Sequence, residues 1–376
     1  MNDCFWRCFG KDTLILALTL FLLSLASTTL GARESAEDVY AVVEVGSSGV
    51  KGQVLQLVAE DPESPPFKLL KLFEPVNENA FTWEASASGK ISAVVAQLHK
   101  EMREQFQLPP KHFFIVGSSG IPTDVKRILS DKIFEEVQER IEYPTAEKES
   151  DLLLRGIVPL HRLSQVVVLD IGSGNSRGAY VDKLRPDLSF SNFDIPWGTK
   201  SCAGEINRIR KDGDFLVTAD AFRLDTLGPE VRKQIERARG MRSLKRVYLV
   251  GGIAWAMATL LHPYDQDGSW VKLSPKDIDT FYEKATTSPG AFLHPDLTNP
   301  PPGMSANNVA NANDELAKIA KVFSEDQLMA GALILKTFMD EMHFEQKDAI
   351  FFRRDALYAW PRGYILEKIS ANRTAK

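Results

Sequence analysis

Hydrophobic and polar positions alternate along this chain in two patterns. Short runs of β-branched and aliphatic residues, within Val39–Val58 and Val166–Val181, predict buried strands interrupted by a glycine-rich turn. Longer stretches carry apolar residues three and four positions apart and predict amphipathic helices, as in Ile91–Phe106, Asp124–Ile141 and Ser324–Met342. Strands that alternate with helices in this way indicate an α/β fold.

The two strand-turn-strand segments are similar in sequence. Aligning Glu44 with Asp170 also aligns Lys51 with Arg177, and an acid, a glycine, a serine, a base and a second glycine recur at the same spacing. A repeated loop of this kind suggests two similar halves that face each other across a cleft. The two bases are expected either to contact outer phosphates of a ligand or to face solvent.

Both turns have the composition of a phosphate-binding loop with a carboxylate on its metal side. Small residues let backbone N–H groups approach a ligand closely, and a nest of such groups binds anions. The residues predicted to bind phosphate are Gly46, Ser47, Ser48 and Gly49 in the first loop, and Gly172, Ser173, Gly174, Asn175 and Ser176 in the second. The alternative is a pair of ordinary glycine hairpins, and the repeat favours phosphate binding.

Length, charge and cysteine content restrict the possible functions further. At 376 residues the chain exceeds what one hydrophobic core usually supports, which again predicts two lobes. A net charge of -5 gives no electrostatic support for nucleic acid as a partner. The three cysteines, Cys4, Cys8 and Cys202, have no metal-site spacing and no disulfide framework, so Cys202 is interpreted as structural.

An apolar run near the N-terminus predicts a targeting segment. Leu14–Ala26 is almost unbroken, follows two basic residues and ends in small residues that suit cleavage. Its length fits the core of a signal peptide better than a full membrane span. We therefore expect an exported protein, periplasmic or membrane-anchored, in which residues 1–32 are either a cleaved signal peptide or a retained anchor.

Three further segments bear on function. Glu149 precedes the second loop by a short helix, which would return its carboxylate to the cleft floor; the alternative is compensation of the helix dipole. Val231–Arg246 is strongly basic and is interpreted either as the solvated face of a helix or as a wall for a polyanion. Pro289–Asn313 is rich in proline and asparagine and predicts a long loop, a candidate lid over the cleft.

In motif order and spacing, residues 39 to 366 resemble the exopolyphosphatase and guanosine pentaphosphate phosphohydrolase (Ppx/GppA) family, part of the superfamily of actin and the sugar kinases. Glu44–Gly49 is similar to the family's first loop, Asp-x-Gly-Ser-Asn-Ser, and Asp170–Ser176 is similar to its Asp-Ile-Gly-Gly-Gly-Ser-Thr. Glu149-Ser150, with Gly156 seven residues later, resembles its Glu-Ala…Gly motif. Arg362-Gly363 resembles one of its late segments.

The resemblance implies two ribonuclease-H-like lobes with phosphate and Mg²⁺ between them. Glu149 would match the family's catalytic base. Glu44 and Asp170 would hold Mg²⁺, an ion that prefers few carboxylates and keeps several waters. Glu44 departs from the family, because it is one methylene longer than the usual aspartate. The first lobe would comprise residues 39–165 with the C-terminal residues 345–376, and the second lobe residues 166–344.

The reaction that the resemblance implies is hydrolysis of phosphoric anhydrides, with release of terminal phosphate from polyphosphate. An apyrase-type nucleoside tri- or diphosphatase, or a guanosine pentaphosphate phosphatase, is the alternative, because Glu44–Gly49 is also similar to the apyrase first loop. The replaced loop residues leave a third interpretation, a non-catalytic sensor of a phosphate ligand. The expected partner is a polyphosphate or nucleotide phosphate, whereas a homodimer and membrane association through the N-terminus stay open.

Overall fold

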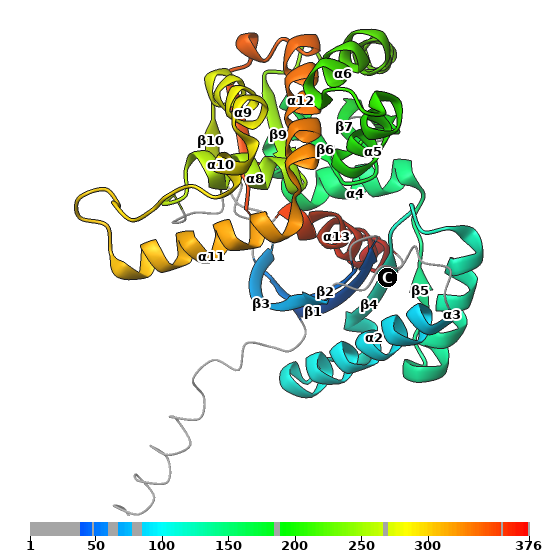
Figure 1. Ribbon diagram of the computed structural model, residues 1–376. Coiled ribbons are helices and arrows are strands. Elements are labelled where there is room, and N and C mark those ends of the chain that lie inside the picture. The colour runs from blue at the N-terminus through cyan, green and yellow to red at the C-terminus, as the bar shows by residue number, and fades with distance from the viewer. Residues whose placement is uncertain are drawn as a thin grey trace, which may run out of the picture.

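Two β-sheets with helices on their faces make up the structure, a computed structural model (Figure 1). It describes residues 38–46, 49–58, 67–76, 85–183, 189–265, 270–354 and 356–374. The predicted targeting segment and two serines of the first loop, Ser47 and Ser48, lie outside these residues. Within the described ranges, no helix is long and apolar enough to cross a membrane. The two sheets confirm the predicted α/β fold with two lobes.

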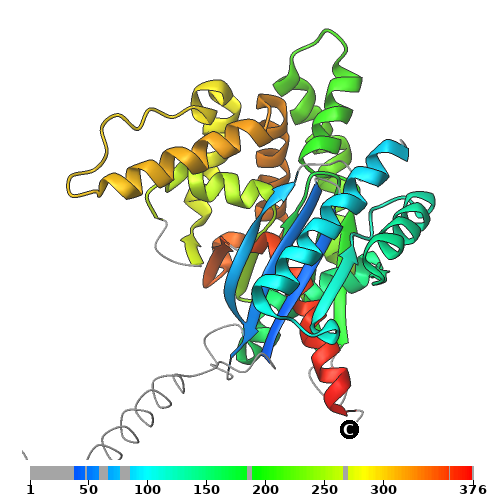
Figure 2. The ribbon, with the colours of Figure 1, turned by 90° about the horizontal axis from the view of Figure 1, so that it is seen from below.

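The first sheet has the strand order β3-β2-β1-β4-β5. Its strands are β1 (Val39–Gly46), β2 (Gly49–Leu57), β3 (Phe67–Val76), β4 (Phe113–Gly117) and β5 (Ile141–Glu142). The β1 strand is apolar at nearly every position because both of its faces are covered. Val43 and Val45 share a core with α2 (Ala85–Phe106) and α3 (Thr123–Val137), which lie across one face (Figure 2). Val42 belongs to a second core on the opposite face.

The second sheet repeats this topology, in the order β10-β11-β9-β6-β7-β8. Its strands are β6 (Val166–Ile171), β7 (Ser176–Lys183), β8 (Ser189–Ile195), β9 (Arg246–Val250), β10 (Trp270–Leu273) and β11 (Ala349–Arg353). β6, β7 and β8 pair antiparallel as β1, β2 and β3 do, and β9 runs parallel to β6 as β4 does to β1. Each predicted loop therefore joins the first two strands of its own sheet.

The last strand contradicts one part of the predicted lobe boundaries. The sequence pattern places residues 345–376 with the first lobe, but β11 pairs in parallel with β9 of the second sheet, with Ala349 opposite Arg246. That assignment is wrong for this strand, because it occupies the place in the second sheet that β5 occupies in the first. The helix that follows, α13 (Ala359–Thr374), does contact β1. The other boundaries stay a prediction.

Two helices, α4 (Ala146–Ile157) and α13, lie between the sheets and pack against each other (Figure 1). Glycines occupy their contact. A Cβ atom on Gly156 would lie 1.8 Å from the carbonyl oxygen of Ala359, and one on Gly363 would lie 1.9 Å from the carbonyl oxygen of Leu152. The two backbones therefore touch directly, with no room for a side chain. Apolar residues of both helices share one core with residues of both sheets.

Most of the remaining helices surround the second sheet, whereas the 3₁₀ helix Pro110–His112 contacts β1 of the first sheet. The remaining helices are α5 (Thr199–Arg210), α6 (Phe215–Phe222), the π-helical segment Arg223–Leu227, α7 (Gly228–Arg237), α8 (Gly252–Leu261), α9 (Pro275–Thr287), α10 (Pro289–Leu293), α11 (Ala306–Val322) and α12 (Glu325–Glu341), with short 3₁₀ helices at Pro110–His112, Leu160–Gln165, Phe344–Gln346 and Ala356–Tyr358. α12 confirms the helix predicted over Ser324–Met342. Cys202 on α5 is free and buried, and burial raises its pKa to about 12, consistent with a structural role.

The long loop predicted over Pro289–Asn313 is wrong for most of its length. α10 and α11 take up both of its ends, so that only residues 294–305 are non-helical. The Ser305 side chain accepts a hydrogen bond from the amide of Asn308 and caps α11. This cap starts a helix in the middle of the asparagine-rich stretch, where composition alone indicates a loop.

Candidate active site

Each of the two hairpins places an acid opposite a base. Glu44 on β1 pairs with Lys51 on β2, and Asp170 on β6 pairs with Arg177 on β7. Directly opposed residues of an antiparallel pair have their side chains on the same face, close enough to interact. Lys51 Nζ accordingly lies 3.7 Å from Glu44 Oε1, and Arg177 Nε lies 3.3 Å from Asp170 Oδ2. The predicted loop repeat is therefore also a repeat of charge pairs.

Glu149 lies in the first turn of α4, and its carboxylate is fully buried. It forms a bidentate ion pair with Arg177, with 2.8 Å from Nη1 to Oε2 and 3.3 Å from Nη2 to Oε1. The loop after β4 donates three further hydrogen bonds, from the Ser118 hydroxyl at 3.3 Å, the Ser119 amide at 3.1 Å and the Ser119 hydroxyl. Because Arg177 also contacts Asp170, one guanidinium joins two of the predicted site carboxylates.

Burial and neighbouring charge oppose each other at these groups. Burial raises the pKa of Asp170 above its ordinary value, although the adjacent Arg177 lowers it. Burial likewise raises the pKa of Glu44, with Lys51 acting against it. Burial alone would lower the pKa of Arg177, but the carboxylates of Glu149 and Asp170 raise it above the usual value. The guanidinium is therefore permanently charged and is the cation around which the site is arranged.

Glu44 has one satisfied and one unsatisfied oxygen. The indole Nε1 of Trp360 on α13 donates to Oε1 at 3.1 Å. Oε2 is buried and has no hydrogen-bond partner among the described residues. An unpaired carboxylate oxygen in a buried position is costly unless a cation or a water completes it. This orphaned oxygen is the feature of the site that fits a bound cation.

The donors present suit Mg²⁺ with few protein ligands. Glu44 and Asp170 offer hard carboxylate oxygens, and Mg²⁺ typically takes one or two carboxylates together with waters and substrate phosphates. Among the described residues, no group of three or more Asp, Glu, His or Cys side chains is arranged to hold a metal. A cation here would therefore take most of its ligands from water and from a phosphate.

The second loop is fixed by the start of α5. The amides of Thr199 and Lys200 donate to the carbonyl oxygens of Gly172 and Ser173, at 2.9 and 2.8 Å. Within the part of the chain that the structure describes, the amides of Ser173 and Gly174 donate to no other backbone group. Two N–H groups are thus free in a loop whose carbonyls are already engaged, an arrangement that suits an anion.

The next two residues of this loop have structural partners. Asn175 Nδ2 donates to Asp194 Oδ1 at 2.7 Å. Ser176 is fully buried, and its hydroxyl donates to the carbonyl oxygen of Trp197 at 2.6 Å. The Ser176 hydroxyl thus holds the strand end against the chain before α5, and its contact with phosphate stays a prediction.

The first loop is described only at its two ends. Gly46 and Gly49 lie opposite each other and close the hairpin. Gly49 has a φ of 131°, a backbone conformation that favours glycine. The phosphate contacts predicted for Ser47 and Ser48 fall outside the described residues. Lys51, at the start of β2, is paired with Glu44 and does not simply face solvent.

Residues that complete the site come from positions that the sequence pattern did not single out as ligands. Ser118 and Ser119 lie in a glycine-flanked turn after β4, so small polar residues at a strand end were the available signal. Trp360 offers no such signal, because it is 316 residues from the carboxylate that it contacts. Arg177 was visible in the repeat, but its bidentate pair with Glu149 depends on how α4 packs.

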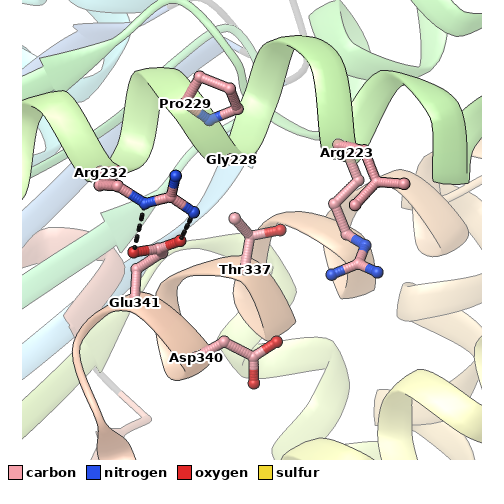
Figure 3. Close-up of a pocket in the computed structure, with 8 residues that line it drawn as sticks. Arg223, Gly228, Pro229, Arg232, Thr337, Asp340 and Glu341 are labelled. Atoms are coloured by element: carbon pink, nitrogen blue, oxygen red, sulfur yellow. Dashed lines mark hydrogen bonds and ion pairs between the residues drawn. The ribbon is translucent and has the colours of Figure 1, made fainter.

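Part of the basic segment Val231–Arg246 borders a separate pocket of about 80 Å³ between α7 and α12 (Figure 3). Arg232 pairs there with Glu341 at 2.7 Å, and Arg242 pairs with the same carboxylate at 3.5 Å. None of the loop or carboxylate residues described above lines this pocket. The single carboxylate of Glu341 offsets one of these two positive charges, so both interpretations of this segment, a solvated helix face and a wall for a polyanion, stay predictions.

Comparison with solved structures shows which known proteins share this fold. No family model and no curated protein matches the sequence. The Ppx/GppA phosphatase of Aquifex aeolicus, in its type II variant, is similar in structure with a TM-score of 0.59 and 13% identity, over 88% of this chain and 99% of that chain. An exopolyphosphatase from Cytophaga hutchinsonii has a TM-score of 0.57 and 15% identity, over 89% and 98%. The chain thus has the two-lobed α/β fold seen in Ppx/GppA phosphatases.

Proposed function

We propose that this protein is a Mg²⁺-dependent phosphoanhydride hydrolase that releases terminal phosphate from linear polyphosphate. The observation that carries the proposal is the meeting of Glu149 and Asp170 at one guanidinium, beside a loop with free backbone amides. Phosphoryl transfer to water requires positioning and charge neutralisation more than covalent chemistry. Buried carboxylates, a fixed cation and free N–H groups are the groups that this chemistry uses.

Each group has a separate role in the proposed reaction. The amides of Ser173 and Gly174 bind oxygens of the terminal phosphoryl group, and Glu149 orients the attacking water and accepts its proton. Glu44 and Asp170 hold Mg²⁺. When bound, Mg²⁺ supplies positive charge that offsets the negative charge on the phosphoryl oxygens.

The choice of polyphosphate as the substrate has two supports. It rests on the fold shared with solved structures described as an exopolyphosphatase and an exopolyphosphatase-like protein. It also rests on export, which we propose from the apolar run Leu14–Ala26 and which would separate the protein from cytosolic guanosine pentaphosphate. A second candidate, a non-catalytic phosphate sensor, is favoured by the complete pairing of Glu149 with Arg177.

A phosphate-release assay tests the reaction and the substrate together. Polyphosphate, guanosine pentaphosphate and ATP are compared with and without Mg²⁺. We expect Mg²⁺-dependent release of phosphate from polyphosphate, with a much lower kcat/KM on both nucleotides. A comparable kcat/KM on ATP would reject the substrate assignment. Failure to hydrolyse any of the three, with phosphate binding retained, would favour the sensor.

The metal role of Asp170 gives a further prediction. Asp170→Asn is expected to weaken Mg²⁺ binding, measured by calorimetry, and to remove turnover, because a neutral amide is a poorer ligand for a hard cation. Asp194→Asn is the matched control: it removes an equal charge beside the same loop, from a carboxylate held by Asn175. Equal Mg²⁺ affinity in wild type and Asp170→Asn would show that this carboxylate is not a metal ligand.

A further inference from the structure

The carboxylate of Glu149 has no acceptor capacity left for a water. Its Oε1 accepts from the Ser118 hydroxyl and from Arg177 Nη2. Its Oε2 accepts from the Ser119 amide, the Ser119 hydroxyl and Arg177 Nη1. An ionised carboxylate offers about four lone-pair sites, and five donors already approach this one. In this arrangement Glu149 cannot receive the proton of an attacking water.

Arg177 supplies two of these five donors and can withdraw both of them together. The serine loop is anchored by its backbone, because the Ser118 amide donates to Val45 O at 2.9 Å and Lys126 Nζ donates to Ser119 O at 2.8 Å. Arg177 instead reaches Glu149 through a long side chain, and 13% of that side chain is exposed. A rotation about its side-chain bonds moves the guanidinium without moving the backbone.

Phosphate is a direct competitor for this guanidinium. Arg177 follows the Gly172–Asn175 loop by two residues and belongs to the same hairpin, so its backbone is next to the free loop amides. The planar guanidinium binds phosphate and carboxylate in the same bidentate manner. A bound phosphate and Glu149 therefore cannot both keep the two terminal nitrogens of Arg177.

We infer that Arg177 is a phosphate-responsive switch that masks Glu149. Without phosphate, the guanidinium occupies both oxygens of Glu149; with phosphate on the second loop, it exchanges Glu149 for the phosphate and frees an oxygen for the attacking water. The assignment of Glu149 as the base rests on the proposed function. The exchange itself is a binding event and requires no turnover.

Binding of inorganic phosphate to the full chain tests the exchange, measured by calorimetry in buffer without divalent cations. Glu149→Gln is expected to bind phosphate at least about tenfold more tightly than wild type, because Arg177 no longer has to break a charge-assisted pair. The same change in an Arg177→Met background is expected to give no such gain. Simple repulsion between Glu149 and phosphate would instead give an equal gain in both backgrounds.

Two further variants keep the test decisive. Glu147→Gln removes the same charge near the same end of α4 but leaves the ion pair of Glu149 with Arg177, so phosphate affinity should stay near that of wild type. Arg177→Met leaves a buried carboxylate without its cation; if it fails to fold, Arg177→Lys replaces it, and there the gain from Glu149→Gln should shrink.

The outcomes separate the switch from the proposed function. An equal gain in both backgrounds, no gain from Glu149→Gln, or no phosphate binding by the wild-type chain would each overturn the switch. If Glu149→Gln raises phosphate affinity only when Arg177 is present, the switch is supported even if polyphosphate is not hydrolysed. In that case only the proposed activity fails. If polyphosphate is hydrolysed but Glu149→Gln raises phosphate affinity equally with and without Arg177, the proposed activity is retained and the switch is rejected.

Discussion

Glu149→Gln is expected to lower kcat on polyphosphate by at least about 100-fold, within the range of two to four orders of magnitude that general bases contribute. Glutamine keeps the size of the side chain and can still accept from Ser118 and Ser119, but it cannot take a proton from water. KM should not rise, because Arg177 is released to the phosphate. A fall in kcat without a rise in KM marks an interaction that acts after binding.

The matched control for this variant lies on the same helix turn. Glu147 is an exposed residue in the first turn of α4, so Glu147→Gln removes the same charge near the same helix end without touching the buried cluster. Its steady-state rates should equal those of wild type. A near-normal kcat for Glu149→Gln, or an equal loss in both variants, would reject Glu149 as the base.

The second large effect is on stability, at the contact between α4 and α13. Gly363→Ala is expected to cost more than about 3 kcal/mol of unfolding free energy, above the usual range for overpacking, because the new Cβ atom meets backbone. It would lie 1.9 Å from the Leu152 carbonyl oxygen and 2.6 Å from the carbonyl carbon. Neither helix can yield by rotating a side chain. Urea-induced unfolding, followed by circular dichroism, measures the difference.

Gly204 provides the control for the same substitution. It lies on α5, and a Cβ atom there would meet nothing within 4 Å. Gly204→Ala should therefore stabilise the protein slightly, by up to about 1 kcal/mol, from helix propensity alone. An unfolding midpoint of Gly363→Ala equal to that of wild type would mean that the two helices separate easily, against the packing described here.

The parts of this protein that the sequence predicted are those encoded locally. An acid at the end of an apolar strand, a glycine turn and a base seven residues later are close along the chain, and the hairpin register alone brings Asp170 to Arg177. The repeat of this pattern then indicated the second sheet. The α/β fold with two lobes followed from such short-range signals, without any knowledge of the packing between helices.

The parts that were missed depend on contacts between distant segments. β11 joins the second sheet between β9 and β10, and composition does not reveal which of the two sheets offers that position. α11 begins at a single serine cap within a loop-like composition. Arg177 was expected to meet phosphate or solvent, and its pair with Glu149 appears only once α4 has packed beside β7.

The hydrogen bond from Trp360 to Glu44 has a consequence for how the protein is made. Its two residues are 316 positions apart, so during synthesis the carboxylate emerges from the ribosome long before its indole partner. At about 5–20 residues per second, that delay is roughly 15 to 60 seconds. β1 can pair with β2 during this time and bring Lys51 to Glu44, but the indole partner of Glu44 is still missing. The Glu44 carboxylate therefore gains its indole partner only after α13 has been made and has docked against β1.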